Sequence, residues 1–220
     1  ALSSAHSGLF PSFIAGIQGT IKDMKGGVKT KMRSFFRRSV PSFLGPVEIV
    51  WTEGSDSICS IVALRLPGEG GPASAFPWEH ELPGHTVPRP VKSMEACIES
   101  FMEGRAPVFP LDSLDLKQLS PFRHKVLLET GRVPPGMTIS YGCLAERIGA
   151  PGAARAVGTA LAGNPFPLVF PCHRVIKASG EMGLFGGGTA LKEVLLHLEG
   201  VSFDDTGRVA PACRLRDGDS

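Results

Sequence analysis

Two short helical segments joined by a tight turn constrain the fold of this chain more than any other feature. The first, residues 140–149, begins at Ser140, a typical helix N-cap, and ends at Gly149. The second, residues 150–165, has Pro151 near its start and closes on a Gly-Asn-Pro run. Two short helices around a glycine-containing turn are typical of a helix-turn-helix, so we expect a helical domain with that motif.

The residues before this motif have the pattern of a small α+β domain. Residues 44–68 contain two β-rich runs, VEIVW and ICSIVALRL, which predict antiparallel strands. Residues 69–90 are crowded with Gly and Pro and predict a long loop. A helix should follow, with Ser93 as its N-cap, Gly104 as its stop and these apolar residues at helical spacing: Met94, Cys97, Ile98, Phe101 and Met102. Strands followed by a helix indicate an α+β domain, which we place at 43–110.

The second half of the chain is mainly helical and is expected to form a domain at 120–201. It follows a predicted linker with the sequence FPLDSLDLKQLSP. Its first helix, near 121–133, would place Phe122, Val126 and Leu127 on one face and end at Gly131. Its last helix, near 189–200, would turn these residues inward: Leu191, Val194, Leu195 and Leu198. Residues 202–220 predict a polar tail.

Residues 1–42 form a basic N-terminal extension that differs in composition from the rest of the chain. They contain seven Lys or Arg residues and one acid, Asp23, and glycines and serines interrupt any helical period. Three interpretations stay open: a loosely packed extension, electrostatic help in binding nucleic acid, and a transit-type sequence rich in basic residues and serine. The net charge of the whole chain, +2, is too small to identify a partner.

The cysteines argue against a disulfide framework and against a structural zinc site. All five lie far apart, without a CxxC pair or a histidine at zinc-finger spacing, so we expect no metal ion. An odd count without paired spacing favours a reducing compartment. No apolar run approaches the roughly 20 residues that a membrane span requires, so we expect no membrane segment.

One cysteine has surroundings that suit chemistry. In the stretch FPLVFPCHRVI, Cys172 follows a proline and precedes His173 and Arg174, and positive neighbours lower the pKa of a thiol. A lone cysteine is more often a small buried hydrophobe. Adjacent residues of an extended segment also point to opposite sides, so proton transfer between Cys172 and His173 would need a bridging water. Local sequence leaves both interpretations open.

A set of linked motifs extends this stretch. They are SY at 140–141, ARAVG at 154–158, NP at 164–165, PCHRV at 171–175, and a glycine-rich turn that leads into KE and then LEG. In this order they resemble the O6-alkylguanine-DNA alkyltransferase family, the methylated-DNA protein-cysteine methyltransferases. The resemblance covers about 43–201 and is weakest before residue 92. It implies an N-terminal antiparallel-sheet domain of RNase H-like type and a C-terminal winged-helix or helix-turn-helix domain.

The resemblance also implies roles for five residues. Cys172 would accept the alkyl group as a thioether, and His173 would draw off the thiol proton through a water. Glu199 would orient and charge-stabilise the imidazole, the logic of a nucleophile, base and orienter. Asn164 would brace the turn before the cysteine, and Tyr141 would donate to the guanine ring. The plain alternatives are a core aromatic for Tyr141 and a surface ion pair for His173 and Glu199.

The substrate pocket that the resemblance implies is lined by these residues: Pro167, Val175, Phe185, Gly186 and Gly187. The two glycines would let backbone approach the base closely. Phe185 stands where members of the family often carry Tyr, and Gly186 where Ser is common, so the polar detail of the pocket departs from the family pattern.

Duplex DNA poses a separate problem, because a thiol cannot reach guanine O6 inside the base stack. The resemblance implies that Arg155, on the second helix of the motif, fills the space that an extruded nucleotide leaves. That helix would enter the minor groove. Ala153, Ala154 and Gly158 fit close approach to DNA, as Tyr141 does from the first helix, and tight helix packing is the alternative for the small residues.

The function that the resemblance implies is DNA repair in one irreversible step, with double-stranded DNA carrying O6-alkylguanine as partner and O4-alkylthymine as an open second substrate. We expect no cofactor and a monomer, located with DNA inside the cell: in the nucleus of a eukaryote or the cytoplasm of a prokaryote. The first alternative is a non-catalytic alkyltransferase-like protein, which would lack the acceptor cysteine. The second, a transcription regulator, is disfavoured because the recognition helix is poor in Asn, Gln and Arg.

Overall fold

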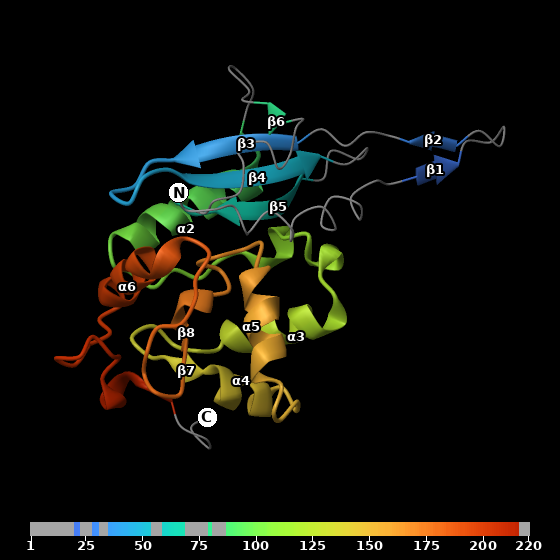
Figure 1. The fold of residues 1–220 in the computed structure, drawn as a ribbon. Helices are drawn as coiled ribbons and strands as arrows, with labels where there is room; N and C mark the ends of the chain where they lie inside the picture. Colours follow the sequence, from blue (N-terminus) through green and yellow to red (C-terminus); the bar gives the residue numbers. More distant parts are fainter. Residues whose placement is uncertain are drawn as a thin grey trace, which may run out of the picture.

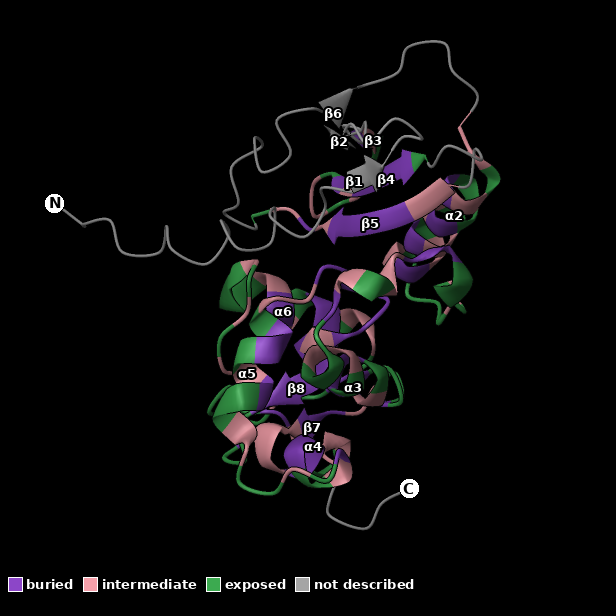
Figure 2. Ribbon diagram, turned by 90° about the vertical axis from the view of Figure 1, so that its right-hand side faces the viewer, coloured by how far each residue is buried: buried purple, intermediate pink, exposed green. Residues whose placement is uncertain are grey.

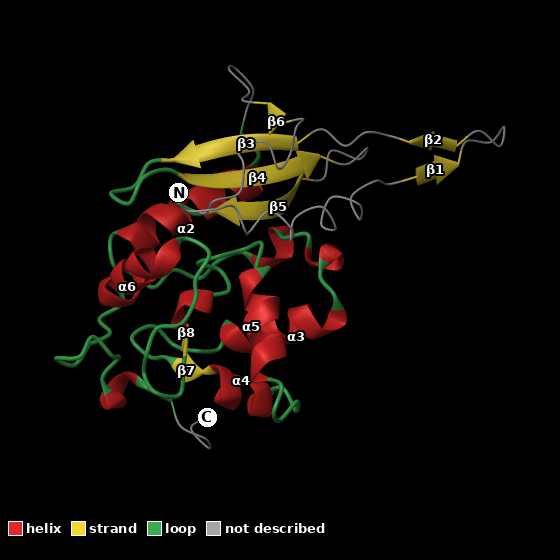
Figure 3. Cartoon of the chain, viewed as in Figure 1, coloured by secondary structure: helices red, strands yellow, loops and turns green. Residues whose placement is uncertain are grey.

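A sheet in the first half of the chain and a group of helices in the second form the two layers of the structure (Figures 1 and 3). The computed structural model describes residues 20–22, 28–30, 35–53, 59–68, 79–80 and 87–215, with only the backbone described for 20–22, 28–30 and 79–80. The predicted loop at 69–90 therefore lies largely outside the described residues.

The sheet has the strand order β5-β4-β3-β6. β3 (Phe35–Val40), β4 (Val47–Glu53) and β5 (Cys59–Arg65) pair antiparallel, and β6 (Glu79–His80) pairs parallel to β3. The strands predicted from VEIVW and ICSIVALRL are confirmed as β4 and β5. A separate hairpin consists of β1 (Thr20–Lys22) and β2 (Val28–Thr30).

β3 comes from the region that the sequence assigned to the basic extension. Arg37 and Arg38 lie on this strand and are committed to ion pairs, with Glu48 of β4 at 3.3 Å and with Glu95 at 2.8 Å. Phe35 and Val40 are buried on the strand. Residues 35–40 are thus part of the sheet, because a neighbouring strand supplies their hydrogen bonds and acids supply partners for their charges.

Helix α2 (Arg89–Met102) covers one face of the sheet. Its buried side chains are Val91, Met94, Ile98 and Phe101. The helix begins earlier than predicted, with Pro88 at the N-cap, so Ser93 lies inside the helix and does not cap it. The following residue pair, Arg89 and Pro90, explains the start, since proline is tolerated in the first helical turn, where no intrahelical partner is lost. Gly104, at φ 78°, follows the end of the helix as predicted.

The predicted linker packs along the sheet. It contains two 3-10 helices, η1 (Leu111–Ser113) and η2 (Leu116–Gln118), and buries Leu114 and Leu119. The backbone N–H of Asp115 donates to the carbonyl of Ile61 at 2.8 Å, and Gln118 donates to the carbonyl of Val62 at 2.9 Å. These bonds fix the second half against β5.

The second half contains these elements: α3 (Pro121–Thr130), β7 (Ile139–Ser140), α4 (Tyr141–Arg147), α5 (Ala154–Ala162), η3 (Cys172–Arg174), β8 (Val175–Ile176), α6 (Gly188–Leu198) and η4 (Pro211–Cys213). β7 and β8 pair in parallel, Ile139 with Val175. The Ser140 hydroxyl accepts from the N–H of Cys143 at 3.0 Å, which confirms the predicted cap. The helix-turn-helix is therefore α4 and α5.

Two predicted inward positions are wrong. Phe122 of α3 is 38% exposed and Val194 of α6 is 37% exposed, whereas Leu196 and Lys192 of α6 are fully buried. α6 packs on the main core through Leu195 and on a second, smaller cluster through Leu196. Contact with two clusters rotates the buried face of the helix away from Val194.

One main core joins the two expected domains. It includes Ile49 of the sheet, Met94 of α2, Leu127 of α3 and Phe166 of the loop after α5. Figure 2 shows buried residues on β5, on α2 and in the centre of the helical half. Among the residues that the structure describes, no helix is long and apolar enough to cross a membrane.

The predicted tail is packed over residues 202–215, and the last five residues lie outside the described part of the chain. Val209 is fully buried, Phe203 pairs with Val209 as an antiparallel bridge, and Thr138 pairs with Arg214 as a parallel one. This segment lies beside β7. The backbone N–H of Thr138 donates to the carbonyl of Cys213, and the carbonyl of Thr138 accepts from the N–H of Leu215.

Candidate active site

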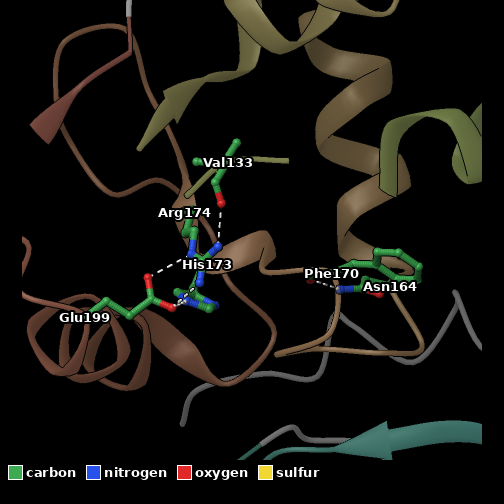
Figure 4. Close-up of polar contacts among 6 residues, drawn as sticks. All are labelled: Val133, Asn164, Phe170, His173, Arg174 and Glu199. Carbon is green, nitrogen blue, oxygen red and sulfur yellow. Dashed lines mark hydrogen bonds and ion pairs between the residues drawn. The ribbon is translucent and has the colours of Figure 1, made fainter. Parts of the chain in front are cut away.

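Cys172 begins a 3-10 turn at the end of a buried loop. Phe166 and Phe170 of this loop are almost fully buried and hold it against the core. The Asn164 amide donates to the carbonyl of Phe170 at 2.8 Å and to the Cys172 sulfur at 3.3 Å, and its oxygen accepts from the N–H of Phe166 at 3.0 Å. Figure 4 shows the Asn164 amide directed at Phe170. One side chain therefore closes the loop and contacts the half-buried thiol.

Leu168 lies in the same loop and has a φ of 70°, in the left-handed region that non-glycine residues rarely adopt. Such a conformation persists only where the surrounding structure imposes it, at a cost of about 1–3 kcal/mol. The apolar anchors on both sides of Leu168 supply that constraint. The loop that ends in Cys172 is thus a rigid support for the thiol.

His173 and Arg174, which directly follow Cys172 in the sequence, form a buried polar network with Glu199 (Figure 4). The Glu199 Oε1 lies 3.0 Å from His173 Nε2 and 2.6 Å from Arg174 Nη2, and Glu199 Oε2 accepts from Arg174 Nε at 2.8 Å. The side chain of His173 is 1% exposed and that of Glu199 is 4% exposed. The pair is therefore in the protein interior and does not fit the surface ion pair that sequence left open.

The buried surroundings determine the protonation states of Glu199 and His173. Burial alone would raise the pKa of Glu199, but its hydrogen bonds to His173 and Arg174 and their charges outweigh burial and lower the pKa to about 2. Burial lowers the pKa of His173, with Glu199 opposing and the Arg174 and Lys192 charges adding to the effect. At neutral pH the imidazole is uncharged and donates its Nε2–H to the carboxylate, which leaves Nδ1 as a proton acceptor.

Arg174 does more than the sequence suggested. Its guanidinium holds both oxygens of Glu199, and Nη1 donates to the carbonyl of Val133 at 2.5 Å. Bidentate binding of this kind fixes a carboxylate in orientation as well as in charge. The sequence analysis considered Arg174 only as a positive charge near the thiol. Its position directly after the Cys-His pair was the sequence feature that could have indicated this second role.

Lys192 was missed as a buried cation. It is fully buried on α6, and its ammonium donates to the carbonyl of Val175 at 2.6 Å and to the carbonyl of Met182. Burial lowers its pKa to about 8, against a raising effect of the Cys172 charge. Lys192 thereby connects the segment after Cys172 to the loop before α6. Two features of the sequence could have singled it out: its place between Leu191 and Leu195, and its membership of the KE motif.

Tyr141 is the first residue of α4 and is half-buried. Burial, followed by the negative charge of Cys172, raises the pKa of its hydroxyl, so the hydroxyl keeps its proton at neutral pH. Two glycines face this side chain. A Cβ at Gly183, where φ is 71°, would lie 3.1 Å from the hydroxyl oxygen, and a Cβ at Gly158 would lie 3.8 Å from the ring. Gly183 is a neighbour of the Tyr141 hydroxyl that sequence did not single out.

The other predicted residues divide by burial. Arg155 is exposed on α5, and Ala153, Ala154 and Gly158 near it are half-buried, while the opposite face of the helix buries Val157. Of the expected pocket residues, Phe185 and Gly187 are half-buried and Gly186 is exposed, but Pro167 and Val175 are buried. In the described part of the chain, no group of three or more His, Cys, Asp or Glu residues could hold a metal ion.

Comparison with known proteins identifies relatives of this arrangement. Residues 121–201 match the family model described as 6-O-methylguanine DNA methyltransferase, DNA binding domain. A methylated-DNA–protein-cysteine methyltransferase of Methanothermobacter thermautotrophicus is 39% identical over 162 residues, 72% of this chain and 81% of that protein. One of Mycolicibacterium paratuberculosis is 37% identical over 154 residues, 70% of this chain and 87% of that protein.

Solved structures agree. The crystal structure of Mycobacterium tuberculosis OGT in complex with DNA superposes with a TM-score of 0.62 at 34% identity, covering 75% of this chain and 93% of that one. The O6-methylguanine-DNA methyltransferase of Pyrococcus kodakaraensis, at 22% identity and a TM-score of 0.52, shares the fold. The predicted α+β class, an N-terminal sheet domain followed by a helical helix-turn-helix domain, is confirmed.

Proposed function

The chain belongs to the methylated-DNA–protein-cysteine methyltransferases, DNA repair enzymes that transfer an alkyl group, and we propose that its acceptor is Cys172, acting on O6-alkylguanine in double-stranded DNA. The observation that carries this proposal is the contact of the Cys172 thiol with Asn164 beside the buried chain of His173, Glu199 and Arg174. A buried carboxylate, an uncharged imidazole and a thiol in sequence make up a nucleophile with its base and orienter.

The proposed reaction begins with the thiol proton. A bridging water passes that proton to Nδ1 of His173, and the ionised Glu199 stabilises the imidazolium that forms. The Cys172 thiolate attacks the carbon bound to guanine O6, a carbon–sulfur bond forms, and the carbon–oxygen bond breaks with its electron pair going to the guanine. The hydroxyl of Tyr141, protonated at neutral pH, donates to the ring and offsets the developing negative charge.

The product is a thioether, which has no easy route back to a thiol. Each protein molecule is therefore expected to act once. We also expect it to act as a monomer and without a cofactor. Exposed Arg155 on α5 supports the proposed extrusion of the target nucleotide, since a long cation on a helix of small residues can occupy the gap in the base stack.

The test of the acceptor is the intact mass of the protein before and after incubation with an O6-methylguanine duplex. Wild type should gain one methyl group on the peptide that holds Cys172, with product reaching a plateau at one equivalent. Cys172→Ala should gain nothing, and Cys97→Ala, which changes another half-buried cysteine, should react as wild type. Transfer by Cys172→Ala would refute the assignment, and tight binding by wild type without any mass gain would favour a non-catalytic alkyltransferase-like protein.

Extrusion is tested separately with two substrates. Arg155→Ala should slow repair of duplex O6-methylguanine by roughly 30- to 150-fold, the equivalent of a penalty of about 2–3 kcal/mol, and barely change the reaction with the free base O6-benzylguanine. Tyr141→Phe should slow both, because its hydroxyl acts on the guanine ring from either source. Equal losses on both substrates for Arg155→Ala would assign Arg155 to the support of the pocket.

A further inference from the structure

The C-terminal segment, residues 202–215, contacts the strand that leads into Tyr141. The Thr138 N–H and its Oγ1 both donate to the carbonyl of Cys213 at 2.7 Å, and the N–H of Leu215 donates to the carbonyl of Thr138 at 2.7 Å. Thr138 is fully buried and immediately precedes β7, whose last residue, Ser140, caps the helix that begins with Tyr141. The segment therefore holds the base of the Tyr141 helix.

The same segment holds the loop of residues 177–183 from outside. The N–H of Val209 donates to the carbonyl of Gly180 at 3.0 Å, and Arg214 donates to the carbonyl of Val209 at 2.7 Å through Nε. A Cβ at Gly180 would overlap the Arg214 guanidinium, so loop and segment are in direct contact. The segment lies outside the residues matched by the family model, which end at 201.

A small apolar cluster fastens the loop to the segment. Its buried members are Ile176 of β8, Leu196 of α6, Val201 and Val209, and Met182, Phe203 and Cys213 pack against it. This cluster is separate from the main core, which includes residues of the sheet and of α2 to α5 together with Leu195 of α6. Loosening the cluster should therefore shift the loop while the main core keeps the protein folded.

The loop and the Tyr141 helix meet at the site. Gly183, at the end of the loop, lies so close to the Tyr141 hydroxyl that an added Cβ would be 3.1 Å from it. We propose that the C-terminal segment is a positioning element of the guanine pocket: it sets the distance between the Tyr141 hydroxyl and the Gly183 backbone by holding Thr138 on one side and Gly180 on the other. This inference rests on the proposed function, in which Tyr141 donates to the guanine ring.

The experiment compares two reagents for Cys172 in the full chain. O6-benzylguanine needs the pocket, whereas iodoacetamide needs only the thiol. Val209→Ala should slow transfer from O6-benzylguanine by about tenfold or more, since a misplacement of about 1 Å can cost as much as about 100-fold, and leave the iodoacetamide rate within about twofold. Val194→Ala, the same change at an exposed valine of α6, should leave both rates as in wild type.

A second pair of variants covers the case in which Val209→Ala does not fold. Thr138→Val removes only the Oγ1 bond to Cys213 and should give the same selective loss, and Thr138→Ser, which keeps the hydroxyl, should restore the rate. Rates that fall in parallel for both reagents, a rise in the iodoacetamide rate, or an unchanged O6-benzylguanine rate in both Val209→Ala and Thr138→Val would overturn the inference. If wild type itself fails to transfer the benzyl group to Cys172, the proposed function fails first.

Discussion

Replacing Glu199 by Gln should destabilise the fold strongly and in a pH-dependent way. The substitution keeps the size of the side chain but removes the charge that His173 and Arg174 share. Arg174, 8% exposed, would then be a buried cation without a carboxylate. Breaking a buried ion pair by removing one partner typically costs about 3–5 kcal/mol, because the remaining charge stays desolvated.

The pKa of Glu199 gives a second measure of the same effect. A carboxyl whose pKa is about 2 in the folded protein and 4.5 in the unfolded chain contributes about 3 kcal/mol at neutral pH, at 1.36 kcal/mol per pKa unit. Because the folded pKa is the lower one, the contribution is complete above pH 4.5 and disappears as the pH falls towards 2. The difference in the free energy of unfolding between wild type and Glu199→Gln should therefore become smaller as the pH falls.

The measurement is urea unfolding at pH 7 and at steps down to pH 3. The matched control is Glu181→Gln, which removes a carboxylate from an exposed pair with Lys177 and should change the free energy of unfolding far less than Glu199→Gln does. Two results would contradict an ionised Glu199 paired with Arg174: equal losses of unfolding free energy for the two variants at pH 7, or a loss for Glu199→Gln that is the same at pH 7 and at pH 3.

Further predictions concern pH, the buried lysine and the N-terminal residues. Because burial lowers the pKa of His173, the rate of transfer from O6-benzylguanine should stay level from pH 8 down to pH 6.5, the ordinary histidine pKa. A pH–rate profile with its midpoint above pH 6.5 would contradict an uncharged His173 at neutral pH. Lys192→Met leaves two carbonyls unpaired and should cost about 1–3 kcal/mol for each by urea unfolding, whereas exposed Lys177→Met should cost under about 1 kcal/mol. Deleting residues 1–34, which spares β3, should lower the salt slope of duplex binding by about 0.9 for each lost phosphate contact; an unchanged slope would assign these residues no contact with DNA.

Features that depend on neighbours in the chain could be predicted. The Ser140 cap, the stops at Gly104 and Gly131 and the two apolar strands follow from hydrogen bonds and backbone preferences within a few residues. The motif around Cys172 also lies within one short stretch, so its resemblance to a family was visible without any structure. The α+β class followed from the order of these local elements.

Features that depend on residues distant in the sequence could not be predicted. β3 carries two arginines and looks solvated until Glu48 and Glu95 are placed beside them. The face that α6 buries follows from its contact with two clusters, so periodicity assigned Val194 to the inside and missed Leu196. The same holds for residues 202–215, whose polar composition hides Val209 at the centre of a small core.

The order of elements, their caps and the Cys-His-Arg run can be read from the amino-acid sequence, because a hydrogen bond to a residue three or four positions away is encoded by those positions alone. The contacts of Glu199 with His173 and Arg174, which are 26 and 25 residues away, and the bonds of Lys192 to two buried carbonyls arise from the folded arrangement. Desolvation explains the difference: a charge in water interacts weakly with its neighbours, but a charge inside the protein requires a partner, and the fold determines which charges are inside.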